Sequence, residues 1–176
     1  MKKNYIGKIV LIGFRGTGKS TVGKKLALLL GMKYLSIDDL IRKEFKLSVN
    51  EIVEKYDWSL FRKKESEIIK SLRSRKNVII DTGGGSILKS INRMNLKHGA
   101  TVIQLTAHKK DIYQRIIAGE DRPALTSIVS LKKEISDVIE SRKELYNSIS
   151  DITINTSKND IKQTVTTILK HIKGLV

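Results

Sequence analysis

The sequence contains no cysteine, and this absence excludes several kinds of site at once. Neither a disulfide bond nor a metal centre built on thiolates can form without that residue. Long apolar runs are missing too, since none approaches the roughly 18–20 residues that span a bilayer. The apolar segment 6–12 is too short for the apolar region of a signal peptide. We therefore expect a cytoplasmic protein without a membrane partner.

Aromatic and acidic residues are scarce as well. Only 5% of the residues are aromatic, which leaves few rings on which nucleic-acid bases could stack. The 18 acidic residues are outnumbered by 34 Lys and Arg, and the formal net charge is +16. This charge is compatible with a compositional bias over exposed faces, with attraction of small anionic substrates, or with nucleic-acid binding. Because the lysines are dispersed along the chain, we expect no nucleic-acid partner.

The most informative segment that is present is glycine-rich. Residues 13–20 read Gly-Phe-Arg-Gly-Thr-Gly-Lys-Ser and follow the apolar run Ile9–Ile12. The spacing G-x-x-x-x-G-K-S between a strand and a helix is typical of the phosphate-binding loop of nucleoside triphosphatases. The glycines let backbone N–H groups surround an anion, and the following helix presents its positive end to it. We expect Lys19 to contact the β- and γ-phosphates and Ser20 to bind Mg²⁺.

Hydrophobic periodicity and turn residues divide the rest of the chain into alternating strands and helices. Strands are expected at Lys8–Ile12, Lys33–Ile37, Asn77–Ile80, Ala100–Leu105 and Asp151–Ile154. Helices are expected at Lys19–Leu30, Asp38–Phe45, Ser48–Tyr56, Trp58–Arg73, Leu88–His98, Lys109–Ala118, Leu131–Ile149 and Asp160–Ile172. This alternation predicts an α/β protein with three layers, in which helices cover both faces of a five-stranded parallel sheet. The carboxyl ends of its strands then meet at one edge.

Several chemically capable residues follow these strands. Asp38 could hold or deprotonate a hydroxyl acceptor, or it could simply cap the helix that begins there. The run Gly83–Gly85 permits close approach of backbone to a ligand, although a tight turn would also explain it. Arg62 and Arg142, taken singly, are typical of solvated arginines. Arg122 lies in the irregular segment and could reach over a transferring phosphate.

Taken in order, these motifs resemble those of the shikimate kinases, a family of small kinases with a nucleoside-monophosphate-kinase-like fold. The resemblance covers nearly the whole chain. It rests on the phosphate loop, Asp38, Phe61-Arg62 with Glu65, Thr82-Gly83-Gly84-Gly85, Arg115, Arg122-Pro123 and Arg142-x-x-Leu145-Tyr146. The phosphate loop is shared with many unrelated ATPases, whereas the ordered set of motifs is far more specific.

The resemblance implies one kinase domain over residues 1–176, which we expect to be a monomer and to use ATP and Mg²⁺. The implied reaction moves the γ-phosphate of ATP to the 3-hydroxyl of shikimate, giving shikimate 3-phosphate and ADP on the route to chorismate and aromatic amino acids. A mobile lid is expected over about residues 119–130. The acceptor-binding helices are expected over about residues 38–73.

Site roles follow from the same resemblance, position by position. Catalysis is assigned to Lys19, Asp38 and Arg122, with Asp38 as the candidate base and Arg122 reaching the phosphates from the lid. Shikimate binding is assigned to Asp38, Arg62, Gly83, Gly84, Gly85 and Arg142, the two arginines holding the carboxylate. Nucleotide binding is assigned to Gly13, Arg15, Gly16, Thr17, Gly18, Lys19, Ser20, Thr21, Arg115 and Arg122, with Arg115 against the adenine.

One departure from the family concerns the metal. The family usually has Asp-x-Asp after the second strand, and this chain has Ser36-x-Asp38, which lacks the first charge. Asp81 ends the third strand, where the family more often has a small residue and other phosphate-loop proteins carry an acidic metal partner. We expect Asp81 to hold Mg²⁺ through water together with Ser20. Asp81 could instead only cap the turn that follows, and Asp39 is a weaker substitute.

Two other functions stay open at this point. A kinase for another small polyol acid such as gluconate would share the phosphate loop and the size. Arg62, Arg142 and the segment Thr82–Gly85 argue against it, because they suit a compact cyclic acid. A nucleotide-dependent nucleic-acid-binding protein is suggested only by the basic charge, and strongly salt-dependent binding to DNA or RNA would favour it.

Overall fold

The centre of the fold is a five-stranded parallel sheet. The computed structural model describes residues 7–118 and 130–173. Its strands are Lys8–Ile12 (β1), Lys33–Ser36 (β2), Val78–Asp81 (β3), Ala100–Thr106 (β4) and Ile152–Asn155 (β5). Their order in the sheet is β2-β3-β1-β4-β5, and each pair of neighbours is parallel. The central strand β1 therefore lies between β3 and β4 and carries the glycine-rich segment.

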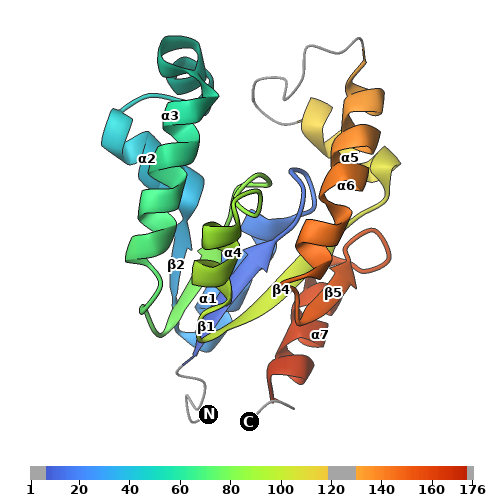
Figure 1. Cartoon of the computed structure of the whole chain (residues 1–176). Coiled ribbons are helices and arrows are strands. Elements are labelled where there is room, and N and C mark those ends of the chain that lie inside the picture. Colours follow the sequence, from blue (N-terminus) through green and yellow to red (C-terminus); the bar gives the residue numbers. More distant parts are fainter. Residues whose placement is uncertain (1–6, 119–129, 174–176) are drawn as a thin grey trace.

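Helices cover both faces of the sheet, which confirms the three-layer α/β/α prediction (Figure 1). They are Lys19–Leu30 (α1), Ile37–Phe45 (α2), Val49–Ser71 (α3), Ser90–Lys97 (α4), Lys109–Ile117 (α5), Leu131–Asn147 (α6) and Ile161–Lys173 (α7). The core on one face joins α1 and α7 to the sheet, and the core on the other joins α2, α3, α4 and the end of α6 to it.

The two cores follow from the alternation of side chains along each strand. In β1, Val10 and Ile12 pack toward α2 and α3, whereas Ile9 and Leu11 pack toward α1 and α7. All of these side chains are completely buried. Burial on both faces explains why β1 reads as a continuous apolar run in the sequence.

Local signals place several helix ends correctly. Gly31 ends α1 with a left-handed backbone, φ 61°, as its position predicts. Ser48 and Glu51 form a reciprocal capping box at the start of α3, with the Glu51 carboxylate 2.7 Å from the Ser48 nitrogen. The two helices expected at 48–56 and 58–73 form α3 in the structure. They are separated by Asp57, whose backbone has φ 69° and whose carboxylate caps the second part.

A few boundaries differ from the prediction by one or two residues. The second strand ends at Ser36 rather than Ile37, because the Ser36 hydroxyl accepts a hydrogen bond from Asp39 N and starts α2. The third strand begins after Asn77, whose φ of 53° is incompatible with a strand. The helix expected from Leu88 begins at Ser90, and α6 ends at Asn147. These shifts leave the order of the elements unchanged.

The predicted functional segments meet at the carboxyl edge of the sheet. In Figure 1 the pair α2 and α3 rises on the left, and the pair α5 and α6 rises on the right, above the ends of the strands. The expected lid, with Arg122 and Pro123, lies outside the described residues apart from Ser130, which caps α6. Among the helices of the described ranges, none is long and apolar enough to cross a membrane.

Candidate active site

The segment between β1 and α1 has the backbone of an anion-binding loop. Gly13, Gly16 and Gly18 have φ values of 139°, 78° and 89°, which L side chains rarely adopt. Lys19 is buried, and its Nζ lies 2.9 Å from the carbonyl oxygens of both Gly13 and Phe14, to which it donates hydrogen bonds. The ammonium group therefore lies against the loop that the motif assigns to phosphate.

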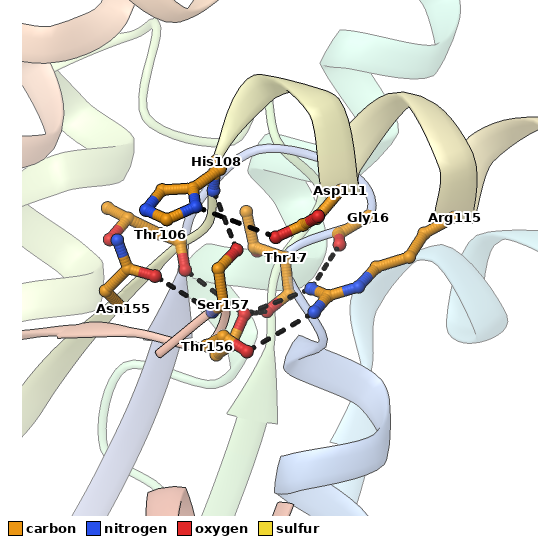
Figure 2. A network of polar contacts seen from close by, with 9 residues as sticks. All are labelled: Gly16, Thr17, Thr106, His108, Asp111, Arg115, Asn155, Thr156 and Ser157. Atoms are coloured by element: carbon orange, nitrogen blue, oxygen red, sulfur yellow. Dashed lines mark hydrogen bonds and ion pairs between the residues drawn. The ribbon is translucent and has the colours of Figure 1, made fainter. Parts of the chain in front are cut away.

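Arg115 of α5 and the residues after β5 hold this loop from one side (Figure 2). The Arg115 guanidinium donates to the carbonyl oxygen of Gly16 and to the Thr156 hydroxyl, both at 3.0 Å. The Thr156 hydroxyl also lies 3.0 Å from the carbonyl oxygen of Thr17. Arg115 is thus fixed beside the phosphate loop. Its contact with adenine stays a prediction.

Asp81, at the end of β3, lies beside the first turn of α1. One oxygen of its carboxylate, Oδ2, accepts hydrogen bonds from the Ser20 hydroxyl at 2.6 Å and from the Tyr34 hydroxyl at 2.7 Å. Burial and the adjacent Asp81 carboxylate raise the pKa of Tyr34, so its hydroxyl keeps the proton that it donates. The carboxylate therefore faces the hydroxyl that the motif assigns to Mg²⁺.

The other acidic residues near the phosphate loop are placed differently. Asp38 is buried in the first turn of α2 and lines a pocket, so the capping role falls to Ser36 and not to Asp38. Asp39 is half-exposed and pairs with Arg42 of the same helix. Of these carboxylates, Asp38 faces the pocket and Asp81 faces the first turn of α1.

A pocket of about 440 Å³ opens next to the phosphate loop. Its walls come from the loop, α2, α3, the turn after β3 and α6. They combine one carboxylate, three guanidinium groups, glycine backbone and apolar rings: Phe14, Arg15, Asp38, Val49, Trp58, Phe61, Arg62, Gly83, Gly84, Gly85 and Arg142. The structure thus brings together every residue predicted to bind the acceptor.

Arg62 is held in the pocket wall by a buried acid one turn away. Its Nη1 lies 2.7 Å from Oε2 of Glu65, and the other Glu65 oxygen accepts a hydrogen bond from Ser86. Burial raises the pKa of Glu65, while the Arg62 charge and the Ser86 hydrogen bond oppose that rise. A Cβ on Gly85 would overlap the Arg62 guanidinium, so a larger residue here would displace this arginine from its present position. Arg62 is therefore a positioned guanidinium and not a freely solvated one.

Arg142 and Tyr146 of α6 converge on the turn after β3. The Arg142 Nη1 and the Tyr146 hydroxyl both donate to the carbonyl oxygen of Gly84, at 3.0 Å and 2.6 Å. Burial lowers the pKa of Arg142, although a guanidinium stays charged in proteins. Burial also raises the pKa of Tyr146 to about 12, which keeps its hydroxyl a donor. The second predicted arginine therefore reaches the pocket from α6, whereas Arg62 reaches it from α3.

Arg15 joins the phosphate loop to α6. Its Nη2 lies 2.6 Å from Oε1 of Glu134, and both side chains are almost completely buried. Because Arg15 also lines the pocket, it lies where the phosphate loop and the acceptor pocket meet. The sequence assigned Arg15 to the nucleotide only.

Several residues that contact the predicted site residues could not be recognised from the sequence as part of the site. Tyr34 lies in a short strand, where an aromatic residue is ordinary. Glu134 is an acid in the first turn of a helix, a common position for acidic residues. Tyr146 was visible in the Arg142-x-x-Leu145-Tyr146 motif but had no assigned role. Thr21, which was predicted to bind the nucleotide, is exposed in the first turn of α1.

The central strand with its phosphate loop, and the adjoining pocket of acid and arginines, define a phosphate-loop protein of the nucleoside-monophosphate-kinase-like type. The family model for shikimate kinase matches residues 15–173. A shikimate kinase of Geobacter sulfurreducens is 35% identical over 165 residues, which is 94% of this chain and 90% of the relative. The chain belongs to the shikimate kinase family.

Solved structures agree with this assignment. A shikimate kinase from Acinetobacter baumannii in complex with shikimate superposes with a TM-score of 0.90 at 31% identity, over 96% of this chain and 94% of that one. A gluconokinase from Sinorhizobium meliloti superposes with a TM-score of 0.63 at 18% identity, over 97% and 94% of the two chains. The likeness to the gluconokinase shows a shared fold alone.

Proposed function

We propose that this chain transfers the γ-phosphoryl group of ATP to the 3-hydroxyl of shikimate. The observation that carries the proposal is the pocket beside the phosphate loop, in which a buried carboxylate lies among guanidinium groups. A small carboxylic acid with several hydroxyls matches this lining, because guanidinium groups bind carboxylates in a bidentate manner and a carboxylate accepts hydroxyl protons.

On the donor side, the proposed roles concern charge. Lys19 exchanges its two carbonyl partners for the β- and γ-phosphates and stabilises the charge that builds up on them during transfer. Arg115 is held at the loop and packs against the adenine. Arg122 reaches the phosphates from the segment outside the described residues. Because phosphoryl transfer needs little covalent help, these residues act by positioning and by charge.

On the acceptor side, Asp38 orients the 3-hydroxyl and receives its proton. Arg62 of α3 and Arg142 of α6 hold the carboxylate of shikimate, supported by the backbone of Gly83–Gly85. In-line transfer requires the hydroxyl to face the phosphate loop. The position of Arg15, which belongs to the loop and lines the pocket, supports binding of the two substrates side by side.

The residues present also fit a Mg²⁺ ion. Magnesium favours hard oxygen ligands and is commonly bound by one or two protein groups together with substrate phosphates. Within the described residues no group of three or more His, Asp or Glu could hold an ion by itself. The Ser20 hydroxyl would be the direct ligand. The Asp81 carboxylate, whose Oδ2 lies 2.6 Å from Ser20 Oγ, would hold metal-bound water. The ion would neutralise charge on the β- and γ-phosphates.

The experiment that tests the function is release of ADP from Mg·ATP by the purified protein. Shikimate, gluconate and nucleoside monophosphates are compared as acceptors, with the Lys19→Ala variant as the control for contaminating kinases. Strong stimulation by shikimate alone supports the proposal, whereas stimulation by gluconate alone replaces it with the polyol-acid alternative. Tight, salt-sensitive DNA binding without turnover would instead favour the nucleic-acid alternative. The expected cytoplasmic location and monomeric state stay predictions.

A further inference from the structure

The carboxylate of Asp81 accepts hydrogen bonds from two hydroxyl groups that lie on different elements. Ser20 comes from α1 and Tyr34 from β2, and both donate to the same oxygen, Oδ2. The carboxylate is 4% exposed, so these two contacts largely determine its orientation. Hydrogen bonds to charged groups are among the stronger ones in proteins. The Tyr34 hydroxyl thus acts as a second anchor on the acid that faces Ser20.

The sheet register shows why this acid matters here. Ser36 on β2 and Asp81 on β3 are directly paired neighbours. By the resemblance described above, the family's usual first aspartate corresponds to position 36, where this chain has a serine whose hydroxyl caps α2. The acidic side chain is therefore present one strand away, at the same level of the sheet. Adjacent strands lie about 4.8 Å apart. Position 81 on β3 is therefore one strand nearer than position 36 to β1 and the start of α1.

The packing around Tyr34 places its ring over α1. A Cβ on Gly23 would lie 2.8 Å from Cε2 of Tyr34, closer than side chains tolerate, so the ring needs a glycine on the facing helix. The ring is half-buried against the core between the sheet and α1. Tyr34 reaches across to β3 from this fixed position, because χ1 and χ2 of a packed aromatic ring leave its hydroxyl little freedom.

We infer that Tyr34 is a positioning residue for the metal site. Its hydroxyl holds the Asp81 carboxylate at Ser20, so that the acidic partner of Mg²⁺ comes from β3 in this chain and not from position 36 on β2. The inference rests on the proposed role of Asp81 toward magnesium. In this arrangement Tyr34 acts through Asp81, to which its hydroxyl donates.

The test measures binding and not turnover. A fluorescent N-methylanthraniloyl derivative of ADP is titrated into each variant with MgCl₂ and again with EDTA. The ratio of the Kd in EDTA to the Kd in MgCl₂ reports how strongly Mg²⁺ and the nucleotide support each other. Asp81→Asn keeps the size of the side chain and is expected to lower this ratio by about 10-fold or more, the usual effect of losing an outer partner of a metal site.

The register offers a rescue that a merely structural role would not show. Ser36→Asp added to Asp81→Asn is expected to restore the ratio, because the charge returns to the paired position, and Asp caps a helix as well as Ser does. Tyr34→Phe is expected to lower the ratio several-fold in the natural background. The same change has no effect in the Ser36→Asp, Asp81→Asn background. Tyr56→Phe, on exposed α3 surface, is the matched control.

The possible failures are distinguishable. If Asp81→Asn leaves the ratio unchanged, the proposed metal role of Asp81 is wrong and the inference about Tyr34 fails with it. If Asp81→Asn lowers the ratio but Tyr34→Phe does not, Asp81 keeps its role and Tyr34 loses its own. If Tyr34→Phe lowers the ratio equally in both backgrounds, its effect is on the fold in general, which also overturns the inference.

Discussion

Removal of Arg62 tests both the acceptor pocket and the buried acid behind it. In Arg62→Ala the pocket loses one of its guanidinium groups, and Glu65 loses its charged partner at 2.7 Å. Glu65 is completely buried, and Arg62 is 19% exposed. The variant should therefore weaken shikimate binding and lower stability, for separate physical reasons.

The effect on binding follows from the hydrogen bonds that a guanidinium donates to a carboxylate. Such bonds contribute about 1.5–3 kcal/mol each. Because Arg142 stays in the pocket, we take a loss of about 3 kcal/mol, which is about a 100-fold rise in Kd for shikimate. The KM for ATP should stay unchanged. Trp58, the single tryptophan, lies with its ring centroid 4.9 Å from the Arg62 guanidinium and gives a fluorescence signal for direct titration.

The effect on stability depends on pH. Breaking a buried ion pair costs about 3–5 kcal/mol, and the partial exposure of Arg62 favours the lower end. For a chain of this size, about 3 kcal/mol corresponds to a fall in Tm of about 6–12 °C. The pKa of Glu65 is already raised from 4.5, and loss of Arg62 raises it further. Because Glu65 binds its proton more tightly in the folded state than in the unfolded state, the free energy of unfolding falls as the pH rises above 4.5.

Thermal unfolding of Arg62→Ala at about pH 5 and about pH 8 checks this sign, and the loss should be larger at the higher pH. Adding Glu65→Gln should remove the pH dependence. Arg42→Ala is the matched control, because Arg42 also pairs with an acid three residues away but is 53% exposed. Equal losses at both pH values, or equal rises in KM for shikimate and ATP, would refute the reasoning.

Three further substitutions separate the donor side from the acceptor side. Lys19→Ala should lower kcat by at least about 100-fold, because the transition state loses one preorganised positive charge. A near-natural rate in a rapid-quench assay would contradict the proposed role of Lys19 toward the phosphates. Asp38→Asn should lower kcat by about 10²–10⁴-fold while ADP still binds with its natural Kd, and a natural kcat would exclude Asp38 as the base. Arg115→Ala should raise the KM for ATP by about 3–30-fold if Arg115 stacks on adenine as proposed. A rise in the KM for shikimate instead would exclude Arg115 from the nucleotide site.

Much of the fold was predictable because its signals are local. The alternation of apolar strands and helices predicted the parallel sheet, and Gly31, Ser48 and Glu51 marked helix ends through short-range hydrogen bonds. Two misplaced boundaries depended on details of single residues, the cap at Ser36 and the backbone angle of Asn77. Asn77 has φ 53° immediately before β3, and nothing in the apolar pattern indicates such an angle.

The candidate site was predictable to a smaller extent. The phosphate loop is contiguous, and Asp38, Arg62 and Arg142 could be placed because the motifs around them resemble those of a known family. The Arg15–Glu134 pair joins residues 119 positions apart, and although Arg15 lies in the phosphate-loop motif, nothing in the sequence links it to Glu134. Such pairs become visible only when both side chains are seen to be buried together.

From the amino-acid sequence alone we could predict a phosphate loop on a strand–helix junction, a parallel α/β fold and the ordered motifs of the shikimate kinase family. These features follow from spacing along the chain, which periodicity and glycine conformation control locally. The partners of Asp81, in contrast, became known only from the folded arrangement. Strand register sets Asp81 beside Ser36, and the packing of Tyr34 over Gly23 carries its hydroxyl to the carboxylate. Register and packing are properties of the assembled sheet and helices, because they arise from contacts between segments that are distant in the chain.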